Sequence, residues 1–445
     1  MRIVKGPRQE CGVPLPLQPR RVQAPEPQRT TVYGIKAALL IPGRGEAFKD
    51  GAVIIDGKKI AWVGVQSSIP SKYSNLPFST VPVLMPGLWD CHVHFMGTPP
   101  GNMSLEALLS QPGVLSGARV VRDLEQTLMA GFTSVRELAG YAGEMTPAIE
   151  DGTVVGPNVY SSIAPLSMTA GHGDLHGLPY SAVVDACSHG LCLAICDGVP
   201  ECIKAVRLMI RRGAKVIKVC ASGGVMSKLD DPEDRQFSDE ELKAIVDEAA
   251  RGKRVVAAHC HGREGILAAL RAGCKTIEHG TYLDEECVAL MKEKGAILVA
   301  TRLIVAAGLD YLDQFPPESQ QKLIETSKYH EAAYKLAIKS GVKCALGTDQ
   351  SESQLGTQLS HGRNGKELWY AVKAGMTPLQ AIEACTATSP ETLGEHFGPK
   401  SGQLKEGYDA DLIAVCANPL DDISILAEPN NVTHVWKGGK LYKST

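Results

Sequence analysis

The sequence predicts an α/β fold: a (β/α)8 TIM barrel with a small β-sandwich domain formed from both chain ends. Two observations predict it. In the middle of the chain, eight short apolar segments of strand character alternate with amphipathic helical segments, whereas both ends contain only short strands and turns. Alternating strands and helices favour parallel strands with crossover helices, and eight such strands close into a barrel more naturally than they form an open sheet.

The two ends of the chain have the same β-strand character. Turn residues separate short strands of similar character in both regions, at 31–43, 51–64, 80–87, 409–418 and 431–444. We therefore expect residues 31–82 and 396–445 to pair into one β-sandwich domain around a barrel at 83–395. Residues 1–30 contain many prolines and arginines and no apolar run of the length that a secretory signal or membrane span needs, which predicts a disordered leader.

The barrel strands follow in order. They are expected at 88–95, 132–138, 157–164, 214–222, 254–261, 274–280, 296–301 and 342–349. Helical patterns between them include 116–131, 200–213, 238–252 and 262–273, which end at glycines that can cap a helix. Ser238 and Glu241 stand at capping-box spacing. Two stretches, 165–198 and 350–366, are expected as long loops, and long loops on a compact barrel are usually functional.

Composition excludes several classes of partner. The formal net charge of the 445 residues is -3, so no basic field is present to attract nucleic acid or an anionic membrane. Small molecules or other protein chains are the expected partners. The thirteen cysteines are an odd number and lie mostly in apolar segments, which favours reduced thiols and a cytoplasmic location.

Unusual polar residues stand near the carboxyl ends of the predicted strands, where a barrel carries its active site. Two residues apart on one strand, His92 and His94 point to the same side. The other members of the set are Lys218, His259, His261, His279 and Asp349. Imidazole and carboxylate are ligands suited to zinc and related divalent ions, so the set predicts a metal site at the barrel mouth.

Lys218 is unusual because it lies in the middle of an apolar strand. Burying an unpaired ammonium is costly, so the group must lose its charge or find a partner. A neutral lysine amine can add carbon dioxide and become a carbamate, which could bridge two divalent ions. A pair with a buried acid, or a Schiff base with a carbonyl substrate, are the alternatives.

The segments PGLWDCHVH, VIKVCASGGVMS, AAHCHG, IEHG, LGTD and GQLKEGYDADLIAV resemble the amidohydrolase superfamily. Within that superfamily, the segments SVRELAG and HGRNGKEL are most similar to the branch that contains zinc-dependent Xaa-Pro and Xaa-hydrophobic dipeptidases and ochratoxinase-type amidases. The resemblance covers most of residues 31–445. It implies that His92, His94 and Asp349 hold one metal, carboxylated Lys218 bridges to a second, and His259 and His279 hold that second metal.

The resemblance also implies the reaction. A hydroxide bridging two divalent ions, expected to be zinc, attacks an amide carbonyl, and Asp349 serves as base and then as acid. His261 is expected to act on the substrate carbonyl or carboxylate. Arg136 is expected either to bind a C-terminal carboxylate or to form an ion pair with Glu137 or another neighbour. Val225, Met226 and His172 are expected to contact the substrate, an N-acyl or N-aminoacyl amino acid with an apolar C-terminal residue, such as ochratoxin A. Members of the family often assemble, so a homo-oligomer is expected.

Two other functions fit parts of the pattern. A cyclic-amide hydrolase or deaminase of the same superfamily uses related metal chemistry, although many deaminases use one metal and no carboxylated lysine. A non-catalytic assembly protein on the same fold would usually have lost ligands, whereas all six ligand positions are filled here.

Overall fold

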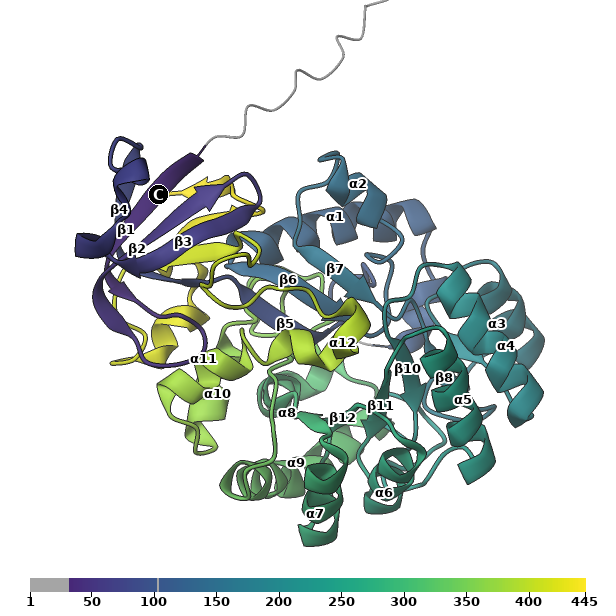
Figure 1. The fold of residues 1–445 in the computed structure, drawn as a ribbon. Coiled ribbons are helices and arrows are strands. Elements are labelled where there is room, and N and C mark those ends of the chain that lie inside the picture. The colour runs from purple at the N-terminus through teal and green to yellow at the C-terminus, as the bar shows by residue number, and fades with distance from the viewer. Residues whose placement is uncertain (1–31, 102–103) are drawn as a thin grey trace, which may run out of the picture. The chain divides into compact units, whose positions relative to one another are not determined.

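A seven-stranded sheet joins the two ends of the described chain, so that yellow C-terminal strands lie beside purple N-terminal ones in Figure 1. The computed structural model describes residues 32–101 and 104–445, and the predicted leader lies outside them. In hydrogen-bonded order the strands are β16 (Lys440–Ser444), β15 (Val432–Lys437), β14 (Leu412–Val415), β4 (Phe78–Pro86), β1 (Val32–Leu40), β2 (Phe48–Asp56) and β3 (Lys59–Val65).

The pairing of β14 with β4 brings these ends together. It is antiparallel, with Leu412 opposite Pro86 and Val415 opposite Val83, and β4 runs parallel to β1 on its other side. Apolar residues from both ends, including Ile55 in β2, share one buried cluster. The expected pairing of the two ends is therefore present, and its seven strands form a single hydrogen-bonded sheet.

The middle of the chain forms parallel strands, as predicted. One sheet contains β5 (Leu88–Val93), β6 (Phe132–Glu137) and β7 (Asn158–Ser161). The other has the order β13 (Ile297–Val299), β12 (Thr276–His279), β11 (Val256–Cys260), β10 (Ile217–Cys220), β8 (Pro165–Ser167) and β9 (Ala194–Ile195). All pairs in both sheets are parallel, which confirms the α/β class.

The expected eighth strand, 342–349, is not a regular strand. Its backbone makes single parallel bridges instead, from Cys344 to Leu298 of β13 and from Gln350 to Val93 of β5. On the other side, the amide of Lys215 donates to the carbonyl of Ser161 in β7 at 2.8 Å. The single closed barrel that the sequence predicts is thus seen as two parallel sheets with isolated backbone contacts between them.

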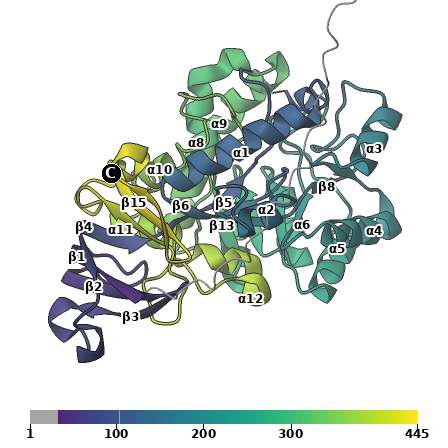
Figure 2. The ribbon, with the colours of Figure 1, turned by 90° about the horizontal axis from the view of Figure 1, so that it is seen from above.

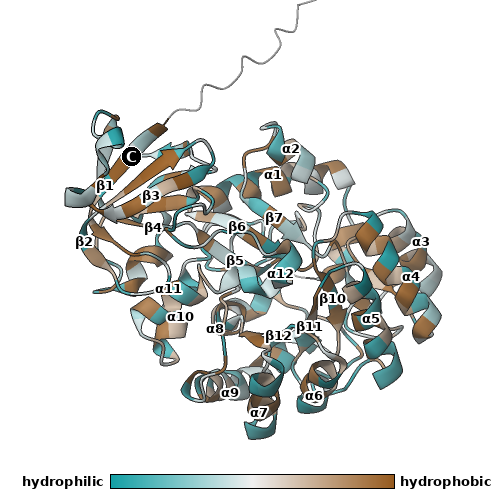
Figure 3. Ribbon diagram, in the orientation of Figure 1, coloured by the Kyte–Doolittle hydropathy of each residue, from teal (hydrophilic) through white to brown (hydrophobic). Residues whose placement is uncertain are grey.

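Helices surround the parallel strands, and Figures 1 and 2 both place α4, α5 and α6 on their outer side. Figure 3 shows hydrophobic residues along β10 and β12, whose residues are all buried, and hydrophilic residues on the surrounding helices. The helices are α1 (Gly113–Met129), α2 (Thr146–Glu150), α3 (Tyr180–Ser188), α4 (Gly198–Arg211), α5 (Asp239–Arg251), α6 (Arg263–Ala272), α7 (Glu285–Lys294), α8 (Arg302–Gly308), α9 (Pro317–Lys339), α10 (Lys366–Lys373), α11 (Pro378–Ala384) and α12 (Gly394–Phe397).

Local signals at the helix ends act as predicted. Ser238 and Glu241 form the capping box of α5, in which each side chain bonds the other residue's backbone. Gly273 ends α6 with φ 103°, a left-handed conformation that glycine adopts without steric cost. The stretch 165–198, expected as a loop, also contains β8, α3 and β9. No helix in the described part of the chain combines the length and apolar character that a membrane span needs.

Candidate metal centre

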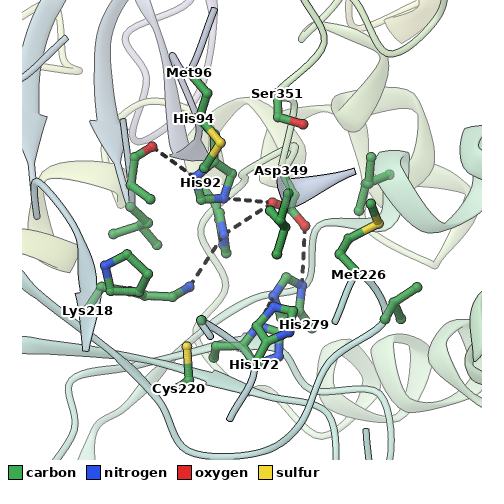
Figure 4. A pocket seen from close by; sticks show the side chains of 18 of the residues that line it. His92, His94, Met96, His172, Lys218, Cys220, Met226, His279, Asp349 and Ser351 are labelled. Carbon is green, nitrogen blue, oxygen red and sulfur yellow. Dashed lines mark hydrogen bonds and ion pairs between the residues drawn. The ribbon is translucent and has the colours of Figure 1, made fainter. Parts of the chain in front are cut away.

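One pocket collects polar side chains from the carboxyl ends of the parallel strands (Figure 4). It is lined by all six residues predicted as metal ligands: His92, His94, Lys218, His259, His279 and Asp349. The predicted substrate-contacting residues His261, His172, Val225 and Met226 line it too. Segments far apart in the sequence therefore place their unusual residues around one space.

Asp349 lies beside the two histidines of the first strand. Its Oδ1 is 2.9 Å from Nε2 of His94 and 3.4 Å from Nε2 of His92. The Nδ1 atoms of both rings have hydrogen-bond partners. Nδ1 of His92 lies 2.9 Å from the carboxylate of Glu278, and Nδ1 of His94 lies 3.0 Å from the carbonyl of Ala139. Such partners fix the tautomer that leaves the Nε2 lone pair free for a metal.

His259 and His279 form a second pair. Nε2 of His279 lies 2.9 Å from Nδ1 of His259, and Nδ1 of His279 lies 2.8 Å from the hydroxyl of Thr301. The carbonyl of Gly223, 3.1 Å from Nε2 of His259, can only accept a hydrogen bond. His259 therefore donates from Nε2 and keeps the lone pair of Nδ1 directed toward His279.

Lys218 stands on β10 with its side chain buried among these groups. Its Nζ lies 3.5 Å from Nε2 of His92. Among the residues that the structure describes, no carboxylate forms an ion pair with it, and burial lowers its pKa. The acid partner considered as an alternative is thus not found in the described chain, and the amine has lost part of its preference for a proton.

The protonation of the pocket suits a metal site. Burial lowers the pKa of His92 to about 4 and drives the pKa values of His259 and His279 well below the ordinary value. Burial alone would raise the pKa of Asp349, but the charges of His92, His94 and Lys218 outweigh it and hold that pKa low. At neutral pH the imidazoles of His92, His259 and His279 are therefore neutral and the carboxylate of Asp349 is ionised, as metal ligands must be.

Two groups of side chains have the proximity that a bound ion requires. The candidate donor atoms of His92, His279 and Asp349 all lie within 4.8 Å of one another, and so do those of His259, His261 and His279. The donor set therefore fits divalent ions. His261, expected as a catalytic and substrate-binding residue and not as a ligand, stands close enough to belong to the second group, while its Nδ1 lies 2.7 Å from the hydroxyl of Thr281.

Arg136 corrects one expectation, because it does not line the pocket. Its guanidinium is fully buried and donates to both carboxylate oxygens of Glu278 at 2.8 and 2.9 Å, to the carbonyl of Cys91 at 2.6 Å and to Thr276 at 3.0 Å. With its donors used in this way, Arg136 supports Glu278 and, through it, His92. It is not available to bind a substrate carboxylate.

Two buried carboxylates near the candidate ligands, those of Glu278 and Asp90, were not predicted from the sequence. Burial tends to raise the pKa of Glu278, yet Arg136 and His92 lower it to about 2, so this group is a buried anion. Asp90 accepts hydrogen bonds from the hydroxyl of Thr348 at 2.6 Å and the amide of Asn364 at 2.7 Å. Acidic residues inside apolar strand segments were the available signal, since a buried charge needs partners.

Three residues at the site have left-handed backbone. The φ angles are 68° at His279, 52° at Thr301 and 62° at Asp349. Each such residue costs on the order of 1–3 kcal/mol and persists only where the surroundings enforce it. Strain of this kind gathers at functional sites, and here it aims two candidate ligands and the hydroxyl that holds one of them.

The rest of the pocket wall is apolar. Val225 and Met226 pack with a cluster from the helical segment 302–323, a contribution that the sequence analysis did not anticipate. The pocket lining from this segment consists of Ile304, Val305, Phe315 and Leu323, and the facing lining includes Met96, Leu105, Leu108, Leu138 and Leu193. In the described part of the chain, Lys218 is the one lysine or arginine that lines the pocket.

Imidazoles, a buried lysine and an aspartate at the carboxyl ends of parallel strands define the site of a metal-dependent hydrolase. The pattern of the Amidohydrolase family matches residues 83–442, and the chain belongs to this family. It is a hydrolase of amide bonds, and the predicted resemblance is confirmed.

Individual relatives agree with this class. The chain is 50% identical to ochratoxinase from Aspergillus niger over 97% of this chain and 91% of that protein. The crystal structure of A. niger ochratoxinase superimposes with a TM-score of 0.87, covering 93% of this chain and 96% of the other. A Xaa-Pro dipeptidase with bound methionine in its active site has a TM-score of 0.80 at 30% identity, covering 93% and 100%.

Proposed function

We propose that the chain is a two-metal hydrolase that cleaves N-acyl or N-aminoacyl amino acids with an apolar C-terminal residue. The observation that carries this proposal is the position of Lys218, a buried amine that faces His92 and lacks a carboxylate partner in the described residues. A neutral amine in such a place can react with carbon dioxide, losing a proton and becoming an anionic carbamate.

The metal ligands follow from this assignment. His92, His94 and Asp349 would hold one ion, His259 and His279 would hold the other, and carboxylated Lys218 would supply an anionic ligand to both. Nitrogen and oxygen donors of this kind suit zinc, which we propose as the metal. Ions held there would lower the pKa of water and polarise the substrate carbonyl.

The chain's own groups supply the proton transfers. Ionised at neutral pH, Asp349 can accept a proton on its carboxylate from the attacking water and return it to the leaving nitrogen. His261, held at Nδ1 by Thr281, directs its other ring nitrogen to the substrate carbonyl. His172 stacks on His259 with ring centroids 4.2 Å apart and stands where the substrate enters the ligand cluster.

The apolar wall supports the choice of substrate. Side chains such as Met226, Phe315 and Leu323 offer contact to apolar groups and few polar partners. Ochratoxin A, an amide of phenylalanine, is the first candidate because ochratoxinase is 50% identical to this chain. The expected products are phenylalanine and the isocoumarin acid.

Three further assignments complete the proposal. The β-sandwich domain comprises 31–82 and 396–445, and the catalytic domain comprises 83–395. The protein works in the cytoplasm, supported by free thiols at all cysteines of the described residues. It works as a homo-oligomer.

The proposal is tested on Lys218→Ala, with Lys204→Ala on the exposed side of α4 as a control. We expect the purified protein to carry about two divalent ions per chain, and Lys218→Ala to lose metal and about 100-fold or more of its activity. Short carboxylic acids should restore part of the activity by replacing the carbamate. Full activity without added acid would contradict the bridging role.

Substrate class is tested with a panel of ochratoxin A, N-acyl amino acids, dipeptides, lactams and aminopurines. Hydrolysis of the amides with apolar C-terminal residues is expected. Turnover of lactams or aminopurines alone would instead assign the chain to the cyclic-amide hydrolases or deaminases, and no turnover at all would favour an assembly role.

A further inference from the structure

A lysine from outside the metal centre binds the loop that forms one wall of the pocket. Lys322 lies on α9, and only 16% of its side chain is exposed. Its Nζ donates to the carbonyls of Ser227 at 2.7 Å and Gly224 at 3.2 Å, and also to the carbonyl of Asp230. The carboxylate Oδ1 of Asp230 lies 3.4 Å away. Four oxygens of the segment 224–230 thus surround one ammonium group.

This segment reaches the site in several ways. Val225 and Met226 line the pocket directly. The hydroxyl of Ser227 lies 2.9 Å from Nδ1 of His172, and His172 stacks on His259. Immediately before the segment, the carbonyl of Gly223 binds His259. A displacement of the segment would therefore move the apolar wall and both histidine contacts together.

The surroundings of Lys322 resemble those of a bound monovalent cation. Carbonyl oxygens can replace the hydration shell of such an ion, and an ammonium group offers a positive charge of similar size with three directed donors. Asp230 supplies a countercharge and also folds the segment, since its Oδ2 accepts from the amide of Gly224 at 3.0 Å and from Gln236 at 3.1 Å. The side chain thus acts as a cation tethered to α9.

The same helix and the residues just before it also contribute to the apolar wall. Leu323 follows Lys322 in sequence and lines the pocket, as does Phe315 just before α9. Val225 and Met226 pack against the cluster that contains both residues. One ammonium group therefore keeps the two halves of the apolar wall in register.

We propose that Lys322 is a positioning residue that determines specificity, because it fixes residues 224–230 as the wall that receives the apolar group of the amide substrate. This role rests on the proposed function, since it assigns that wall to an amide substrate. Lys322 itself does not line the pocket among the described residues.

The test compares Lys322→Met, Lys322→Arg and the control Lys328→Met. Lys328 lies on the same helix, but its side chain is exposed and forms an ion pair with Glu325, which is also exposed. For an apolar N-acyl amino acid we expect KM to rise about tenfold in Lys322→Met with kcat within about twofold, because binding rather than chemistry is lost. The KM of Lys322→Arg should lie between those of Lys322→Met and the unmodified chain. The KM of Lys328→Met should equal that of the unmodified chain.

Hydrogen exchange gives a readout that does not depend on activity. Amide exchange in 224–230 should accelerate about tenfold or more in Lys322→Met and stay unchanged in Lys328→Met. If the unmodified chain hydrolyses none of the amides, the proposed function fails, while exchange still reports whether Lys322 holds the segment. Unchanged KM together with unchanged exchange would overturn the inference.

Cation rescue separates positioning from general stability. In Lys322→Ala, potassium or ammonium ions should lower KM again by about threefold or more, whereas tetramethylammonium, which is too large for the oxygen cage, should not. Equal recovery with tetramethylammonium would show an effect of ionic strength and contradict the tethered-cation role. Failure of both Lys322→Met and Lys322→Arg to fold would assign Lys322 to overall stability and overturn the specificity role.

Discussion

Buried histidines dominate the pocket at the scale of single residues. Burial lowers the pKa of His92 and His172 to about 4 and that of His261 to about 3. The rings are therefore neutral near pH 7 and keep lone pairs for metal or substrate. His94 and His279 take their orientation from groups behind them, the carbonyl of Ala139 and the hydroxyl of Thr301.

These pKa values predict that acid destabilises the metal-free chain. In the unfolded chain each ring binds a proton near the ordinary value of 6.5. Between that pH and about 4 the unfolded state binds more protons, so stability falls as pH falls, by up to about 1.4 kcal/mol per pH unit for each histidine. Urea unfolding after treatment with chelator, at pH values from 7 to about 4.5, measures the effect.

Carboxyl groups whose pKa is raised by burial act in the opposite direction, and they include Asp90, Glu137 and Glu352. Burial raises the pKa of Glu367 to about 8 and that of Asp411 to about 6. The folded chain binds extra protons at these groups, so the stability they contribute at low pH is lost as pH rises through those values. The histidines with lowered pKa outnumber them, and the net effect remains a loss on acidification. A urea midpoint that rises between pH 7 and 4.5 would contradict this balance.

Secondary-structure elements position these residues in pairs. Arg136 of β6 and Glu278 of β12 form a fully buried ion pair across the interior, and Glu278 in turn holds His92 of β5. These contacts link β12 to β5 and β6, which belong to the other parallel sheet. The pair explains why β6 carries an arginine next to its last residue although Arg136 does not line the pocket.

Removing this arginine should be costly. In Arg136→Met, Glu278 would remain as a buried charge without its main partner, and we expect a loss of about 3–5 kcal/mol in the free energy of unfolding. The matched control is Arg363→Met, whose partner Glu428 is exposed, with an expected loss below about 1 kcal/mol. Denaturant unfolding of both variants checks this, and equal losses would show that the buried pair has no special role.

At the scale of the whole molecule, the proposed metal ligands come from strands far apart in the sequence and line one pocket. The proposed ligands extend from His92 to Asp349, and they stand on five of the predicted strands. Metal ions bound to them would link these strands directly, and a ligand that binds only the folded state stabilises it by mass action.

Removing divalent ions should therefore lower the melting temperature of the whole protein. We expect EDTA to reduce Tm by several degrees, since about 3 kcal/mol of binding energy corresponds to shifts of that size in a large chain. Added zinc should restore the original Tm, and magnesium, which prefers oxygen ligands, should not. A Tm that is unaffected by EDTA would contradict a resident metal, and calorimetry measures each case.

Much of the site could be predicted from local sequence. The types of ligand and their places at strand ends follow from strand periodicity, which depends on neighbouring residues only. The partner of Arg136 could not be predicted from local sequence. A strand-end arginine can equally face a substrate or a buried acid, and its partner Glu278 stands 142 positions away in the sequence.

The sequence by itself determined the parallel α/β class, the pairing of both chain ends and the set of histidines, lysine and aspartate that surrounds the pocket. Only the tertiary structure showed that Arg136 pairs with Glu278 and that the backbone is left-handed at His279 and Asp349. It also showed that Lys322 of α9 binds the segment that carries Val225 and Met226. The physical reason is distance along the chain. Periodicity and capping are local, whereas buried charges and carbonyl groups are satisfied by whichever partner folding brings near.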